Sequence, residues 1–166
     1  LNQYKLTDIS LLLFATIIGF FIFNYPPAKL YLGDSGSLFI GYCLGFLSIV
    51  FNWTPTGDTI YTSFLNPIFL FFTIPLLDFI IVISHRIKKG ISPTTGGTDH
   101  VSHRFLATGL PETKVLALFI LYTIMIFTLI LVSMTSSTFI SYGVLIIFLS
   151  IFVVTFFKVS KMKVLE

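Results

Sequence analysis

Hydrophobic residues fall along this chain in long runs that short polar stretches separate. A helix needs about 20 apolar residues to cross the hydrocarbon core of a bilayer, within a range of about 17 to 25. Five runs are long enough, and we expect each to form a membrane helix: residues 9–25, 37–53, 63–84, 114–134 and 138–157. The pattern predicts an all-α fold, a polytopic membrane protein whose residues 1–166 form a single membrane domain with about five transmembrane helices.

Two prolines lie in the third run, at Pro67 and Pro75. Proline has no backbone N–H and collides with the preceding helical turn, although neighbouring helices can compensate in a membrane. We therefore expect a kink or a broken turn within residues 63–84. The overall composition agrees with a membrane chain, because only 10% of the residues are charged, against about 25% in soluble domains.

Lysine and arginine are distributed unevenly between the polar connections. The connections at residues 26–36, 85–113 and 158–166 carry eight of the ten basic residues, whereas 54–62 and 135–137 carry none. Five alternating crossings place the three basic connections on one face, which the positive-inside rule makes cytoplasmic. The C-terminus is then inside and the N-terminus outside. Membrane orientation explains the net charge of +3, so we expect no nucleic-acid partner.

The first candidate site is an acid between two glycines directly before an apolar run, Gly33-Asp34-Ser35-Gly36-Ser37. Glycine allows a tight or left-handed backbone, and Ser35 or Ser37 can cap the helix that follows. Free N–H groups at a helix start suit phosphate, and a carboxylate there can hold Mg²⁺ against a diphosphate. The alternative is a capped turn at the membrane border with a solvated Asp34.

The second candidate site lies in the long connection 85–113, which we expect to be a cytoplasmic substrate-binding loop. Six consecutive positions hold Asp99, His100, His103 and Arg104. In a helix, both histidines and the arginine share one face, and with the neighbouring lysines they make an anion site. Two alternatives stay open: a basic loop on anionic lipid head groups, and a zinc site that lacks a fourth ligand.

Two further features accompany these sites. Asp78 lies within the third run, and an ionisable group in a membrane helix is a functional candidate by default; the alternative is a structural acid that bonds neighbouring helices. The Gly96-Gly97 pair would let the backbone of the loop turn back toward the membrane.

Taken together, these motifs resemble the C-terminal half of the polyprenyl-phosphate N-acetylhexosamine-1-phosphate transferases, glycosyltransferase family 4. The family's Gly-Asp-x-Gly-Ser motif matches Gly33–Ser37, and its Pro-x-x-Asp helix matches Pro75–Asp78. Its Arg-x-x-x-Gly-x-Ser-Pro segment matches Arg86–Pro93, and its histidine-rich loop matches Asp99–Arg104. The motifs occur in the family's order over nearly the whole chain. The resemblance favours the undecaprenyl-phosphate N-acetylglucosamine-1-phosphate transferases over the phospho-N-acetylmuramoyl-pentapeptide transferases.

The resemblance implies a reaction in which a polyprenyl phosphate attacks the sugar-linked phosphate of a UDP-N-acetylhexosamine, starting an envelope polysaccharide or cell-wall glycan. It also implies a bacterial inner membrane and Mg²⁺, with Mn²⁺ as the alternative ion. By resemblance Asp34 is the catalytic residue and metal ligand. His100, His103 and Arg104 bind the sugar nucleotide, Asp99 orients the loop, and Asp78 is supportive. A homodimer stays open.

Two acidic motifs of the family's N-terminal half, an Asp-Asp pair and an Asp-Gly-rich segment, do not occur in this sequence. We therefore expect the chain to be the C-terminal portion of a larger transferase and inactive by itself. The competing class of function is a non-enzymatic membrane transporter or scaffold. A transporter places polar groups near the middle of the membrane, where Asp78 is the one candidate.

Overall fold

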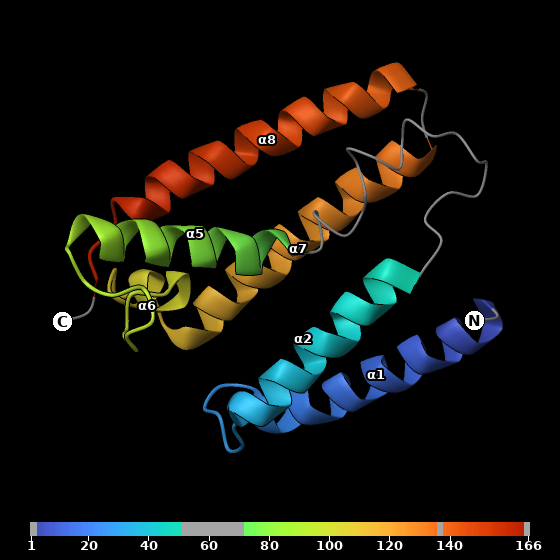
Figure 1. The fold of residues 1–166 in the computed structure, drawn as a ribbon, viewed down its shortest axis with the longest axis horizontal. Coiled ribbons are helices and arrows are strands. Elements are labelled where there is room, and N and C mark those ends of the chain that lie inside the picture. The colour runs from blue at the N-terminus through green and yellow to red at the C-terminus, as the bar shows by residue number, and fades with distance from the viewer. Residues whose placement is uncertain (1–2, 51–71, 136–137, 165–166) are drawn as a thin grey trace. The chain divides into compact units, whose positions relative to one another are not determined.

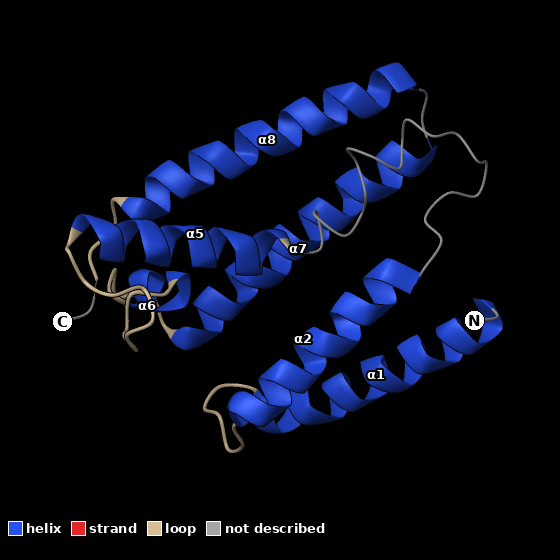
Figure 2. Ribbon diagram, in the orientation of Figure 1, coloured by secondary structure: helices blue, strands red, loops and turns tan. Residues whose placement is uncertain are grey.

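The structure is a computed structural model that describes residues 3–50, 72–135 and 138–164. The described residues form helices and loops without strands (Figures 1 and 2). Their helices are α1 (Gln3–Asn24), α2 (Gly33–Val50), α5 (Thr73–Lys88), α6 (Val101–Leu106), α7 (Glu112–Thr135) and α8 (Thr138–Ser160). The chain divides into two compact units, Leu1–Asp58 and Thr59–Glu166, each of which is described by itself.

Among the residues that the structure describes, four helices are long and apolar enough to cross a membrane: Tyr4–Asn24, Gly33–Val50, Glu112–Ser133 and Phe139–Ser160. They correspond to four of the five predicted runs, so the all-α membrane fold is confirmed. The third run, residues 63–84, lies partly outside the described residues, which include its second half as part of α5.

The kink or broken turn expected within residues 63–84 stays a prediction, because Pro67 and the chain before Phe72 lie outside the described residues. Helix α5 begins at Thr73 and continues unbroken to Lys88. Pro75 is therefore in the first turn, where a backbone N–H has no partner within the helix and its loss costs little. The C-cap residue Lys89 follows the helix, and after it comes Gly90, whose φ is +69°.

The N-terminal unit contains α1, α2 and the short loop between them. Asn24 Nδ2 donates a hydrogen bond to the Leu30 carbonyl at 2.9 Å, and the Lys29 N–H donates to the Phe23 carbonyl at 2.9 Å. These bonds close the loop that leads to Gly33. No residue of α2 is buried within the chain, which suits a helix whose sides face lipid or other protein.

The C-terminal unit packs α5 and α7 against α8, and α6 against both α5 and α7 (Figure 1). Its core consists of Leu77 and Ile81 from α5, Val101 from α6 and Val159 from α8, each at most 4% exposed. Because Val101 is the first residue of α6, this core holds the beginning of the short helix against α5 and the end of α8.

Candidate functional site

Asp34 lies in the first turn of α2, directly after Gly33. Gly33 has a φ of +67°, a left-handed conformation that favours glycine. The Asp34 side chain is exposed, and its carboxylate has no hydrogen bond or ion pair to any residue that the structure describes. A negative charge at a helix start interacts favourably with the helix dipole. The structure therefore presents a carboxylate with no protein partner at the beginning of a membrane helix.

The two serines expected to cap this helix are inside it, because α2 begins at Gly33. Ser37 Oγ donates to the carbonyl of Asp34 at 3.0 Å, so it bonds within the helix instead of capping it. The close packing at Gly36 is a further finding. A Cβ at this position would lie 2.7 Å from Leu32 Cγ, so the second glycine lets Leu32 fold back over the first turn.

Arg86 and Asp99 form a bidentate ion pair at the end of α5. Arg86 Nε donates to Asp99 Oδ2 at 2.8 Å and Nη2 donates to Oδ1 at 2.6 Å, with both side chains 9% exposed. Arg86 Nη1 also donates to the carbonyls of Pro93 and Thr95. The guanidinium thus bonds three residues of the connection that leads to α6, namely Pro93, Thr95 and Asp99. Hydrogen bonds from Arg86 lower the pKa of Asp99 to about 2.

Gly97 is required by the packing of this ion pair. A Cβ at Gly97 would lie 2.9 Å from Asp99 Oδ1 and 3.2 Å from Arg86 Nη2, whereas one at Gly96 would contact nothing within 4 Å. Neither glycine has a positive φ; those that do in this unit's described part are Gly90 and Gly109. The glycine at position 97 therefore provides space for the ion pair, and the predicted turn toward the membrane stays a prediction.

Arg104 is fully buried on the inner side of α6. Its Nε donates to the Asp99 carbonyl at 2.9 Å, and Nη1 donates to the carbonyls of Ser160 at 3.5 Å and Met162 at 3.2 Å. Those last two carbonyls lie at the C-terminal end of α8, where a cation is favourable. Burial lowers the pKa of Arg104 below its ordinary value. This geometry gives Arg104 a helix-capping role, which differs from the substrate contact predicted from sequence.

His100 and His103 lie together at the beginning of α6, with ring centroids 6.5 Å apart. His100 Nδ1 is 2.8 Å from Asp78 Oδ2, and the Val101 N–H donates to Asp78 Oδ1 at 2.6 Å. The His100 side chain is 47% exposed and His103 is half-buried. These two imidazoles are therefore the groups of the predicted second site that a ligand can reach.

Sequence reasoning missed two contacts that build this site. Arg86 was considered only as a basic residue and a motif position, although it is the partner of Asp99. The alternative for Asp78, a structural acid that bonds a neighbouring helix, is confirmed by its contacts with the first turn of α6. Its partner could not be named from spacing, because 22 residues separate Asp78 from His100. The sequence signal that marks Asp78 is its place in the Pro-x-x-Asp motif.

Asp34 belongs to the N-terminal unit, and the other predicted site residues belong to the C-terminal unit. Their meeting at one face stays a prediction. Within the described part of the chain, no group of three His, Cys, Asp or Glu residues could hold a metal. A zinc site of Asp99, His100 and His103 therefore has no support there. Asp34 fits Mg²⁺ as a single ligand, since this ion often takes one or two carboxylates and completes its shell with water and phosphate.

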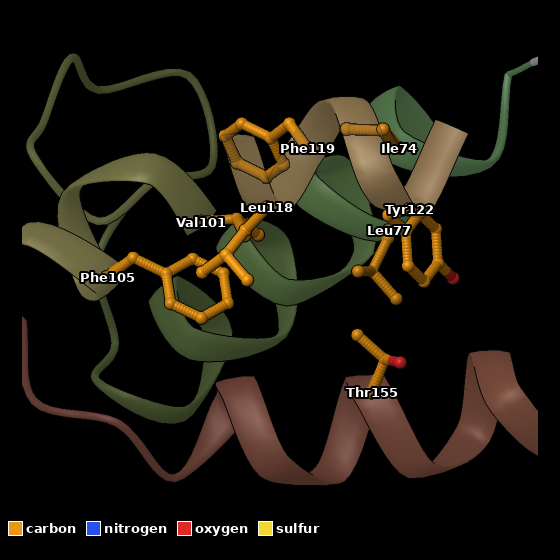
Figure 3. Close-up of a pocket in the computed structure, with 8 residues that line it drawn as sticks. All are labelled: Ile74, Leu77, Val101, Phe105, Leu118, Phe119, Tyr122 and Thr155. Atoms are coloured by element: carbon orange, nitrogen blue, oxygen red, sulfur yellow. The ribbon is translucent and has the colours of Figure 1, made fainter. Parts of the chain in front are cut away.

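An apolar cavity of about 160 Å³ lies inside the C-terminal unit (Figure 3). Its lining comes from the four helices that the structure describes in this unit, α5 to α8: Ile74, Leu77, Val101, Phe105, Leu118, Phe119, Tyr122 and Thr155. Almost no polar surface faces it, so it is not a site for the polar part of a substrate.

Comparison with known proteins identifies relatives of this chain. Residues 1–52 match the profile of glycosyl transferase family 4. A probable undecaprenyl-phosphate N-acetylglucosaminyl 1-phosphate transferase of Bacillus subtilis is 31% identical over 92% of this chain and 39% of its own length. A decaprenyl-phosphate N-acetylglucosaminephosphotransferase of Mycobacterium leprae is 31% identical over 72% of the chain and 32% of its length.

A phospho-N-acetylmuramoyl-pentapeptide-transferase of Thermotoga petrophila is 32% identical over 70% of this chain and 35% of its own length. The chain thus spans between about a third and two fifths of these relatives. No solved structure matches it. The profile match covers the segment with Asp34, and the relatives extend the similarity over both units. By these matches the chain is similar to glycosyl transferase family 4 over its first 52 residues, and to relatives named as polyprenyl-phosphate and phospho-N-acetylmuramoyl-pentapeptide transferases over both units.

Proposed function

We propose that the protein to which this chain belongs transfers a sugar-1-phosphate from a UDP-N-acetylhexosamine to polyprenyl phosphate in the bacterial inner membrane. The observation that carries this proposal is the similarity to a probable undecaprenyl-phosphate N-acetylglucosaminyl 1-phosphate transferase over 92% of the chain. The residues support it chemically, because an exposed carboxylate lies at the start of the candidate membrane helix α2 and two accessible imidazoles lie at the beginning of the short helix α6.

The reaction exchanges one phosphoanhydride bond for another. An oxygen of the polyprenyl phosphate attacks the sugar-linked phosphorus, the bond from that phosphorus to the UMP oxygen breaks, and UMP leaves with the electron pair. Such transfer depends mainly on positioning and on neutralising charge. Asp34 would hold Mg²⁺, or Mn²⁺ as the alternative, and the bound ion would neutralise diphosphate oxygens. His100 and His103 would bind the phosphates of the nucleotide.

Asp99 and Arg104 would serve this reaction indirectly. Asp99 holds Arg86, and Arg104 holds α6 to the end of α8. Both therefore position the histidines. Since a nucleotide sugar is made in the cytoplasm, we place this face on the cytoplasmic side, as the distribution of lysine and arginine predicts.

A transfer assay with the purified protein, as its gene encodes it, tests the proposal. We expect radiolabelled UDP-N-acetylglucosamine and undecaprenyl phosphate to yield a lipid-soluble labelled product together with UMP. The yield should disappear on chelation of divalent ions and return with Mg²⁺. A protein that accepts only UDP-N-acetylmuramoyl-pentapeptide would belong to the other branch of the family. Failure with both donors would overturn the proposed function.

The orientation has its own test. In a variant whose native Cys43 is changed to serine, Ser92→Cys introduces a thiol at an exposed position of the 85–113 connection. A membrane-impermeant thiol reagent should label it from the cytoplasmic side only. Labelling of intact cells from outside would invert the proposed topology.

A further inference from the structure

The carboxylate of Asp78 bonds two different groups at the beginning of α6. Oδ1 accepts the Val101 N–H at 2.6 Å, and Oδ2 lies 2.8 Å from His100 Nδ1. His100 is the N-cap residue of α6, yet its side chain makes no capping hydrogen bond. A residue of α5 therefore caps α6 from outside, and it holds the imidazole of the cap residue at the same time.

The contact with Asp78 has a chemical consequence for His100. A carboxylate accepts hydrogen bonds, so the proton of a neutral imidazole in this contact is on Nδ1. Nε2 is then the nitrogen available to a ligand. A carboxylate that orients a histidine in this way fixes both the tautomer and the ring orientation of the working group.

The surroundings of His100 leave it open to a ligand. Its side chain is 47% exposed, while that of Asp78 is 29% exposed. His103 is its aromatic neighbour, and the carboxylate of Asp99 is occupied by Arg86. A solvent-accessible contact of this kind contributes little to stability, so we attribute the Asp78–His100 contact to orientation of the ring, while the bond to the Val101 N–H caps α6.

We propose that Asp78 is a positioning residue that fixes the His100 ring through Nδ1, so that Nε2 contacts a phosphate of the nucleotide sugar. This inference rests on the proposed function for the identity of the ligand. The observation that supports the proposal is the contact of one Asp78 carboxylate with both His100 and the Val101 N–H.

A double-variant experiment separates the two bonds of Asp78. Asp78→Asn keeps an oxygen that can accept the Val101 N–H but removes the carboxylate from Nδ1. We expect it to lower kcat/KM for the nucleotide sugar by roughly 10- to 100-fold. In a His100→Ala background the same change should have an effect of about 2-fold or less. An equal loss in both backgrounds would show that Asp78 does not act through His100.

Nuclear magnetic resonance of ¹⁵N-labelled histidine gives a readout that needs no turnover. At an alkaline pH where the imidazole is neutral, we expect the His100 proton on Nδ1 in the native protein and on Nε2 in Asp78→Asn. His100→Ala assigns the signal. A proton on Nε2 in the native protein, or one that Asp78→Asn does not move, would overturn the proposal.

The matched control is Glu112→Gln, which removes an exposed carboxylate from the first turn of α7 in the same unit. It should leave both kcat/KM and the His100 signal unchanged. Failure of the proposed function is distinguishable, because the native protein would then transfer no sugar phosphate while the His100 tautomer could still be read.

Discussion

The two units of this chain present their charged residues in opposite ways. In the N-terminal unit, Asp34 is exposed at the start of α2, and its carboxylate has no partner among the described residues. In the C-terminal unit, Arg86, Asp99 and Arg104 are buried and bonded to one another or to backbone carbonyls. We therefore expect motif residues of similar chemistry to have different tasks: Asp34 would bind a ligand, whereas the buried three would hold the histidines in place.

The comparison predicts that variants of the first unit affect catalysis alone, and that variants of the second affect the structure first. The largest effect is expected for Asp34→Asn. Transfer should fall by about 100-fold or more, because the substitution removes the charge that would hold the metal, while the melting temperature should not change. The measurement is the transfer assay together with thermal unfolding in mild detergent.

Asp8→Asn is the matched control for Asp34, since Asp8 is an exposed aspartate of the same unit in α1. It should transfer at the native rate. Near-normal turnover of Asp34→Asn would remove this residue from the site and remove the contrast between the units.

Asp99→Asn should have the next largest effect, and on stability. It leaves the buried Arg86 guanidinium without its charged partner, which is costly. We expect the melting temperature to fall by on the order of 5 °C, with a loss of transfer that follows the unfolded fraction. A loss of activity in a protein that melts normally would instead place Asp99 in contact with substrate.

Acid should weaken the same ion pair. The folded-state pKa of Asp99 is about 2 and its ordinary value is 3.8. The pair's contribution to stability is therefore complete above the ordinary value and is lost as the pH falls through about 2. The native melting temperature should decline in this window more steeply than that of Asp99→Asn, and parallel curves would contradict the assignment.

Gly97→Ala should have a smaller effect on the same pair. The added methyl group would lie 2.9 Å from Asp99 Oδ1, so the ion pair must shift to accommodate it. We expect a melting temperature about 3 °C lower. Gly96→Ala adds the same group one residue earlier, where nothing lies within 4 Å, and should melt like the native protein. Equal losses in both variants would indicate a backbone effect instead.

The smallest effect is expected for Arg104→Lys, which keeps the charge but loses the planar set of donors. Lysine cannot serve the carbonyls of Asp99 and Met162 together. Amide hydrogen exchange in the last turn of α8 should increase by about tenfold, with the KM for the nucleotide sugar unchanged. A raised KM with unchanged exchange would restore the substrate contact that the sequence predicts.

Much of the fold could be predicted because a bilayer imposes a simple rule on composition. Runs of apolar residues long enough to span it must be helical, since only helices and closed barrels satisfy the backbone there. Residues 114–134 and 138–157 correspond closely to α7 and α8. The effect of Pro75 is harder to predict, because it depends on the place of proline in the helix, and sequence does not give the helix start.

The sequence by itself determined which residues could do chemistry: the motif around Asp34, the histidines 100 and 103, and the acids near them. The tertiary structure decided their separate tasks. Arg104 is buried and Asp99 is paired with Arg86, while Asp78 reaches across 22 residues to His100. The physical reason is that a local pattern fixes residue type and helical spacing, whereas burial and pairing depend on which helices pack together.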